Sequence, residues 1–311
     1  MASLRGSWAR ASLAIAAAGL VVTGVAAIAL AVSVARRVVT PPTVREEDVR
    51  ILAVDERAGT VTLAPTPETV VPGRYGMWFS RDAGYLRVGT VLSADDREVV
   101  RRLEAVGTLG GATRGRWSGW YYLRPDELGL PFTEVSVPTD LGPAPAWCFP
   151  GAAAEGPVAG DSRWVIQMHG RGVTRSEALR AVPVFHELGF TSLLISYRND
   201  GEAPASDDGR YSLGDAEWRD LEAAVRFARE QRAQRILVMG WSMGGASTLQ
   251  FVTRSELSSA VEGIILESPV VDWIRVLHAQ AAQQGLPDPV RSVALGVLGS
   301  EWASGWAGRS E

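Results

Sequence analysis

The segment Gly240–Gly245, with the sequence GWSMGG, is the stretch that decides the predicted fold. It follows the apolar run Arg235–Met239 and precedes Ala246–Val252, which has the pattern of a helix. A buried strand that turns sharply into a helix at Ser242 needs glycine neighbours, because the backbone is strained and other elements come close. A G-x-S-x-G segment in this setting is typical of a nucleophilic serine beside a helix N-terminus. The alternative is a glycine-rich turn that holds a phosphate or no ligand.

Strand-like and helix-like segments alternate on both sides of this turn. The predicted strands are Phe132–Val137, Ala146–Phe149, Trp164–Met168, Ser192–Tyr197, Arg235–Gly240 and Gly263–Leu266, and the predicted helices between them are Arg175–Leu188, Ala216–Arg232 and Gly244–Arg254. Apolar strands separated by helices indicate a parallel sheet that is covered on both faces. The predicted fold class is therefore α/β, with a doubly wound, mostly parallel sheet in a domain spanning residues 131–311.

The order of motifs along this domain resembles the α/β-hydrolase superfamily. His169-Gly170 follows one predicted strand, the sequence YRND at residues 197–200 follows the next, and LESP at residues 266–269 comes after the serine turn. The resemblance covers about residues 132–295. Within the superfamily, the chain is similar to membrane-anchored bacterial members of the esterase, lipase and prolyl-oligopeptidase-like group.

This resemblance implies a serine hydrolase that cleaves ester, thioester or amide bonds of a small-molecule or peptide acyl substrate. Ser242 would form the acyl-enzyme, and the backbone N–H groups of Met243 and Arg171 would stabilise the oxyanion. Neither a metal nor an organic cofactor is implied. Arg198 and Asp200 would lie at the entrance to the site, or would form a salt-bridged rim of the loop.

The acid and the base of a catalytic triad are not evident. In the superfamily the triad runs in the order serine, acid, histidine. Asp272 is the candidate acid, with Glu267 behind it, and His278 is the candidate base. Alternatively, Asp272 caps the helix Trp273–Gln283 and His278 packs within it. We expect His169 to be a structural hydrogen-bonding residue, and His186 to lie at the surface or to cap a helix.

The chain after the predicted strand Gly263–Leu266 has no pattern of a seventh or eighth strand. Trp273–Gln283 and Pro289–Val297 read as cap helices instead. We therefore expect a C-terminally truncated hydrolase whose last strand exposes apolar side chains. The alternatives are a catalytically dead hydrolase that acts as a binding or scaffold protein, and a divergent functional arrangement.

The first 37 residues predict a single-pass transmembrane anchor. Residues 11–35 carry no charge, and as a helix they would rise about 37 Å, enough to cross a hydrocarbon core of about 30 Å. A cleaved signal peptide is the alternative, although its apolar region is usually about 7–15 residues long. Arginines flank both ends and do not determine the orientation. The expected location is the cell membrane, with the hydrolase domain outside.

Residues 38–130 are expected to form a linker and a small β-rich accessory region. Val49–Val54 and Thr60–Leu63 alternate around a turn and predict a hairpin. Short β-like runs follow, then a helical pattern over Ala94–Val106 and a glycine-rich loop at Gly107–Gly119. No residue of this region carries recognisable chemistry.

The composition excludes several kinds of site. The 311 residues include no lysine, so Schiff-base chemistry and a P-loop lysine are ruled out. The single cysteine, Cys148, excludes an internal disulfide and a cysteine-built zinc or iron–sulfur site. The formal net charge of −4 argues against binding to nucleic acid.

Overall fold

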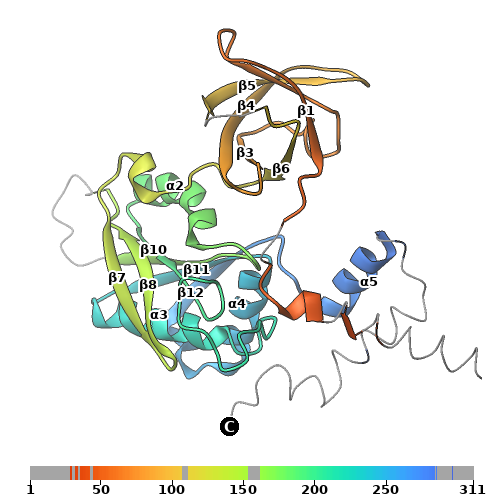
Figure 1. Ribbon diagram of the computed structural model, residues 1–311. Coiled ribbons are helices and arrows are strands. Elements are labelled where there is room, and N and C mark those ends of the chain that lie inside the picture. Colours follow the sequence, from red (N-terminus) through yellow and green to blue (C-terminus); the bar gives the residue numbers. More distant parts are fainter. Residues whose placement is uncertain are drawn as a thin grey trace, which may run out of the picture.

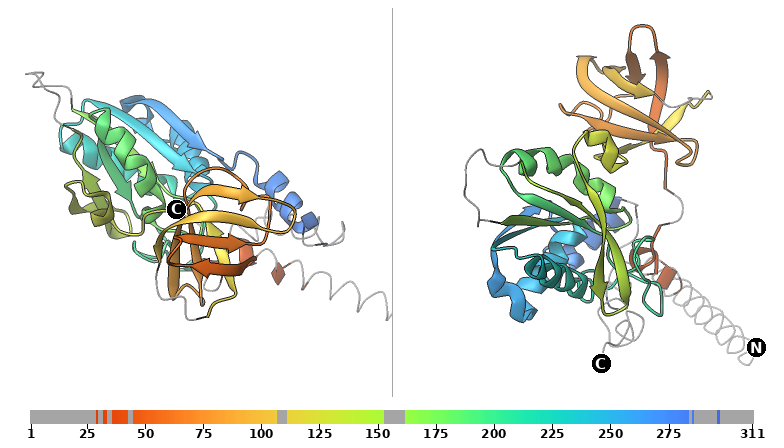
Figure 2. Two further views of the ribbon diagram at one scale, coloured as in Figure 1. Left: turned by 90° about the horizontal axis from the view of Figure 1, so that it is seen from above. Right: turned by 90° about the vertical axis from the view of Figure 1, so that its left-hand side faces the viewer.

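The computed structural model describes residues 29, 32–33, 36–42, 45–106, 111–152, 162–283, 285 and 296. They form a closed β-barrel and a six-stranded sheet with helices on both faces (Figures 1 and 2). Within these residues, no helix combines the length and the apolar character that crossing a membrane requires. The predicted anchor at residues 1–37 lies almost entirely outside the described residues.

The barrel is built from six short antiparallel strands. They are β1 (Val49–Asp55), β2 (Thr60–Leu63), β3 (Tyr75–Phe79), β4 (Gly84–Ala94), β5 (Val99–Val106) and β6 (Arg114–Ser118). The strand order is β1-β2-β5-β4-β3-β6, and β6 closes the barrel by pairing with both β3 and β1. Val61, Leu63, Met77 and Leu86 are fully buried inside it. The predicted hairpin is confirmed as the β1–β2 pair.

Two predictions for this region are wrong. The helical pattern over Ala94–Val106 falls on the end of β4 and on β5, because Val99, Arg101 and Leu103 alternate inward with period two. Because Arg101 occupies one of the inward positions, the alternation is not visible when only apolar residues are counted. The predicted loop Gly107–Gly119 contains β6, the strand that completes the barrel.

The second body contains the predicted α/β sheet. Its strands are β7 (Thr133–Thr139), β8 (Gly142–Phe149), β9 (Arg163–Met168), β10 (Thr191–Ile195), β11 (Arg235–Trp241) and β12 (Val261–Glu267). The order is β12-β11-β9-β10-β8-β7. Strands β12, β11, β9 and β10 are mutually parallel. Strand β8 is antiparallel to β10, and β7 is antiparallel to β8. The carboxyl ends of the four parallel strands therefore meet at one edge of the sheet, which is where a site is expected.

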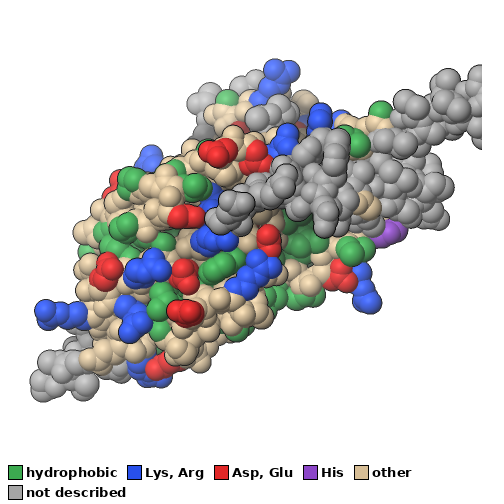
Figure 3. Space-filling model, turned by 90° about the horizontal axis from the view of Figure 1, so that it is seen from below, with side chains coloured by type: hydrophobic (Ala, Val, Ile, Leu, Met, Phe, Trp, Pro, Cys, Tyr) green, Lys and Arg blue, Asp and Glu red, His purple; other side chains and the backbone are tan. Residues whose placement is uncertain are grey.

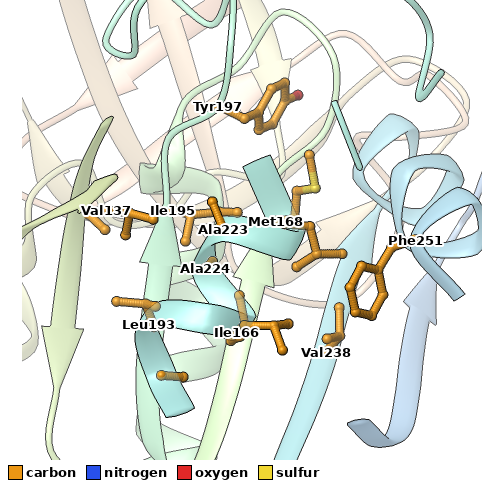
Figure 4. Close-up of a cluster of buried hydrophobic side chains, with 14 of the residues drawn as sticks. Val137, Ile166, Met168, Leu193, Ile195, Tyr197, Ala223, Ala224, Val238 and Phe251 are labelled. Carbon is orange, nitrogen blue, oxygen red and sulfur yellow. The ribbon is translucent and has the colours of Figure 1, made fainter. Parts of the chain in front are cut away.

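Helices cover both faces of this sheet. On one face, α3 (Trp218–Glu230) and α4 (Met243–Arg254) bury the main core, which includes Ile166, Leu193 and Phe251 (Figure 4). The 3₁₀ helix η2 (Arg175–Ala181) and α2 (Val182–Glu187) pack on the opposite face. The predicted single helix Arg175–Leu188 is thus split in two, because Pro183 is tolerated only in the first turn of an α-helix.

The last described strand, β12, pairs only with β11 within the described residues. Ile264 and Ile265 of β12 are each 38% exposed, and Val271 beyond it is 74% exposed. Apolar side chains therefore reach solvent at this edge, as the strand pattern predicted. The second predicted cap helix, Pro289–Val297, lies almost entirely outside the described residues. Elsewhere the surface is mixed in charge: the face in Figure 3 intersperses arginine with acidic side chains.

Candidate active site

Ser242 lies at the turn between β11 and α4, at the carboxyl end of the parallel strands. Its φ of 49° and ψ of −111° are strained for a residue with a side chain. Backbone hydrogen bonds hold this conformation: Ser242 N donates to the carbonyl of Glu267 at 3.0 Å, and Val270 N donates to the carbonyl of Ser242 at 3.1 Å. The sharp turn predicted from the sequence is therefore present, and the end of β12 supports it.

The glycines of the GWSMGG segment are required by close backbone contacts. A Cβ at Gly240 would lie 2.6 Å from the carbonyl oxygen of Gly244. A Cβ at Gly244 would lie 2.2 Å from the carbonyl oxygen of Met168, at the end of β9. A Cβ at Gly245 would lie 2.8 Å from the Pro269 side chain. The start of α4 therefore packs directly against β9 and against the segment after β12.

The loop His169–Gly172 lies beside the serine. A Cβ at Gly170 would be 3.3 Å from Cβ of Ser242, so the structure brings this loop and the predicted nucleophile together. Met243 is the first residue of α4, and the first N–H groups of a helix have no acceptor within it. The two predicted oxyanion donors, Met243 and Arg171, thus belong to the two segments that adjoin Ser242.

Side chains of the α/β domain hold His169 and Gly170, the first half of this loop, and most of them are buried. Gly170 N donates to Oε2 of Glu177 at 2.7 Å, and the Tyr197 hydroxyl donates to the Gly170 carbonyl at 2.7 Å. The ring nitrogens of His169 lie 2.9 Å from the Gly170 carbonyl and 3.1 Å from Oδ2 of Asp200. His169 is fully buried and stacks on Tyr197. It has the environment expected of a structural histidine.

The YRND loop carries buried ion pairs, as one of the two interpretations of this loop expects. The Arg198 guanidinium donates to both carboxylate oxygens of Asp220, at 2.7 and 3.1 Å, and both side chains are nearly buried. Burial raises the pKa of the Asp200 carboxyl. The hydrogen bond with His169 and two backbone N–H donors outweigh burial, so its pKa lies below the ordinary value. Both residues therefore stabilise the loop from within.

The structure places the predicted acid and base on α5 (Trp273–Gln283) and at its start. Oδ1 of Asp272 accepts from Arg275 N at 3.1 Å, which makes Asp272 the N-cap of this helix. Glu267 accepts from Trp241 Nε1 at 2.6 Å and pairs with Arg180. His278 lies on α5. Within the described residues, none of the three histidines hydrogen-bonds Ser242.

Sequence reasoning missed the residues that hold the loop. Glu177 and Tyr197 lie 7 and 27 positions from Gly170 along the chain. No local pattern marks either as part of the site. Arg37, Val38 and Arg45, which the sequence placed at the end of the anchor and in the linker, also contact the loop through Arg171 and Gly172.

Two family models match parts of the chain. The model of the prolyl oligopeptidase family matches residues 179–289, which contain the serine turn. A model described as a domain of unknown function (DUF8805) matches residues 50–118, which form the barrel. No curated protein matches the sequence.

Solved structures with similar folds include several hydrolases. An esterase from Pyrococcus furiosus is 21% identical over 55% of this chain and 65% of its own, with a TM-score of 0.43. A serine hydrolase without a lid, from Xanthomonas campestris, is 23% identical over 39% and 56% of the two chains, with a TM-score of 0.33. The chain therefore spans less than two thirds of the length of either protein. The family match over residues 179–289, the sheet order and the serine turn agree with an α/β-hydrolase fold for this part of the chain.

Proposed function

We propose that the chain is a serine hydrolase in which Ser242 attacks the carbonyl carbon of an ester, thioester or amide. The observation that carries the proposal is the strained serine turn with the loop His169–Gly172 packed against it. The attack forms a bond between Oγ and the carbonyl carbon and places negative charge on the carbonyl oxygen. The N–H groups of Met243 and Arg171 would stabilise that oxygen, and the leaving group would depart with a proton.

Water would then attack the acyl-enzyme and release the acid, which regenerates the serine. The substrates would be small-molecule or peptide acyl compounds. The proposal covers the nucleophile and the oxyanion donors, and Asp272 and His278 remain the candidates for acid and base. We further propose that residues 1–37 form a single-pass anchor in the cell membrane with the hydrolase domain outside, on the strength of the uncharged stretch 11–35.

A second candidate function is binding without turnover on the same fold. It is favoured by the absence, within the described residues, of a histidine that hydrogen-bonds Ser242. A serine without a base is a poor nucleophile, and losing the base can cost about 10⁶-fold in kcat. The oxyanion hole alone would leave a rate about 10³–10⁴ above water.

The test is covalent labelling of the full chain with a fluorophosphonate, followed by mass measurement of the labelled peptide. We expect one adduct on Ser242 in the wild type and none in Ser242→Ala, because the phosphorus must bond to this Oγ. The matched control is Ser259→Ala, at an exposed position after α4, which should label like the wild type. Labelling that persists in Ser242→Ala would contradict the proposal. Failure of the wild type to label would favour binding without turnover.

A further inference from the structure

Residues 36–42 and Arg45 form a strap that lies against the loop beside Ser242. The strap leads to β1 of the barrel, and it runs along the hydrolase domain in the orange-red part of Figure 1. Its backbone is tied to this domain, because Tyr211 N donates to the carbonyl of Val39 at 2.8 Å. A Cβ at Gly172 would lie 2.7 Å from the side chain of Pro42. The strap and the loop are therefore in direct contact.

The Arg171 side chain makes the main connection between them. Its Nε donates to the carbonyl of Val38 at 2.5 Å, and its Nη2 donates to the carbonyls of Arg37 at 2.6 Å and Thr40 at 3.1 Å. Residues 36–39 are helical. The last carbonyls of a helix have no N–H donor within it, and they favour a nearby cation. The fork of the guanidinium can bond several of these oxygens at once, which an ammonium cannot do in the same geometry.

Arg45, at the other end of the strap, also contacts the second half of the loop, which consists of Arg171 and Gly172. Its guanidinium donates to the carbonyl of Gly172 and lies over the ring of Trp120, which follows the barrel. Burial lowers the pKa of both Arg45 and Arg171. Within the described residues, neither arginine forms an ion pair with a carboxylate. The two guanidinium groups contact carbonyl oxygens and aromatic rings, so both side chains connect the strap to the loop.

The two halves of the loop are thus held by different parts of the molecule. Glu177 and Tyr197 hold Gly170 from inside the domain. Arg171 and Gly172 are held by the strap, with one further bond from Gly172 N to the Tyr211 hydroxyl at 3.3 Å. The proposed oxyanion donor, the N–H of Arg171, lies in the half that the strap holds. A displacement of about 1 Å in such a group can cost about 10²-fold in rate.

We propose that the Arg171 side chain is a positioning residue, which uses the strap to hold the Arg171 backbone N–H toward the reacting oxygen at Ser242. This inference rests on the proposed function, because it assigns the strap a part in the same site. The segment that joins the N-terminal region to the barrel then contributes to the rate of acylation. It does so without touching the substrate.

The test uses the full chain and the variants Arg171→Ala and Arg171→Lys. Both variants keep the backbone N–H and change the side-chain contacts, which are the bonds to the strap and the approach of the guanidinium to the Tyr211 ring. The matched control is Arg226→Ala, which removes an arginine paired with Glu222 on α3. We measure the maximal rate and the half-saturating concentration for fluorophosphonate labelling of Ser242, and the hydrogen exchange of the amides of residues 169–172.

We expect Arg171→Ala to lower the maximal labelling rate by about 10²-fold with little change in half-saturation. Arg171→Lys should fall between it and the wild type, and Arg226→Ala should match the wild type. The amides of Arg171 and Gly172 should exchange faster in Arg171→Ala, whereas that of Gly170 should not. If Arg171→Ala does not fold, Arg171→Lys decides by the same measurements.

An unchanged maximal rate, or unchanged exchange at Arg171 and Gly172, in a wild type that does label would overturn this inference alone. A wild type that does not label at Ser242 would overturn the proposed function, and this inference with it. A rise in half-saturation with an unchanged maximal rate would mean that Arg171 affects reagent binding and not the position of its N–H.

Discussion

The strained backbone of Ser242 is possible because glycines at the points of closest approach leave room for the surrounding backbone. The residue lies where β11, β9 and the end of β12 approach α4, and each approach uses a glycine or a backbone group. The energy that the strain costs is offset by two backbone hydrogen bonds, from Ser242 N to the Glu267 carbonyl and from Val270 N to the Ser242 carbonyl. At the scale of the single residue, the site therefore depends on the lack of Cβ atoms at the surrounding glycines as much as on the serine itself.

Gly244→Ala tests this account. A Cβ there would lie 2.2 Å from the carbonyl oxygen of Met168 and 2.5 Å from that of His169, and neither backbone atom can move easily. Alanine favours a helix over glycine by about 1 kcal/mol. We nevertheless expect destabilisation by at least about 1–3 kcal/mol from overpacking, together with loss of fluorophosphonate labelling. Urea unfolding of the full chain measures the first effect.

The control for this prediction is Gly263→Ala in β12. Its Cβ would lie 3.3 Å from Cδ2 of Leu237, a flexible side chain that can give way. We expect a change within about 0.5 kcal/mol. If Gly244→Ala were as stable as the wild type, the contact between α4 and β9 would not be the reason for a glycine at this position.

At the scale of the element, strand β5 shows how a buried charge can be compatible with a small barrel. Arg101 is fully buried, and its guanidinium donates to the carbonyls of Thr69, Val71, Gly73 and Gly89 at 2.8–2.9 Å. The rings of Tyr75 and Trp117 lie near it. This side chain ties the segment between β2 and β3 to β4, so the barrel depends on a polar connection across its interior.

We expect Arg101→Met to destabilise the barrel strongly, whereas Arg102→Met should have little effect. The first change removes the buried donors to the carbonyls of Thr69 and Gly89, at about 1–3 kcal/mol for each unsatisfied group. Arg102 is the next residue of β5 and is exposed, so it provides a matched control. Hydrogen exchange of β4 and β5 in the full chain measures the difference. Equal protection in both variants would contradict the structural role of Arg101.

At the scale of the whole molecule, the barrel and the sheet form separate cores, and residues 119–132 and the strap connect them. The one cysteine, Cys148, lies in β8, between β10 and β7, and burial raises its pKa to about 11. Its thiol therefore reports on the hydrolase domain and not on the barrel. At pH 8 about one thiol in a thousand would be ionised in the folded chain.

We expect the folded chain to react slowly with a disulfide reagent at pH 8. The rate should rise about tenfold per pH unit toward pH 10, because the thiolate is the reactive form. In urea the rate should increase sharply where the sheet unfolds. Glutathione in the same buffers corrects for the reagent's own pH dependence. Rapid reaction of folded protein at pH 8 would show that β8 opens or that the thiol has a lower pKa.

The sequence alone determined the parts of the fold that depend on short-range patterns. The serine turn occupies six consecutive residues, and its strand and helix adjoin it, so Gly240–Gly245 could be interpreted without the structure. The strands β9 to β12 are continuous apolar runs and were recognisable for the same reason. The loop His169–Gly172 was placed beside Ser242 by the resemblance to the α/β-hydrolase superfamily, in which the loop after an earlier strand supplies an oxyanion donor.

Only the tertiary structure decided the features that depend on distant partners. Strand β5 carries an inward arginine whose acceptors come from β4 and from the segment between β2 and β3, so its pattern favoured a helix. Strand β6 is a strand because β1 and β3 pair with it. The bonds that hold the loop join Arg171 to carbonyls more than 130 positions away in the chain. Hydrogen bonds across such separations leave no periodic pattern in sequence, because their partners are brought together only when the whole chain folds.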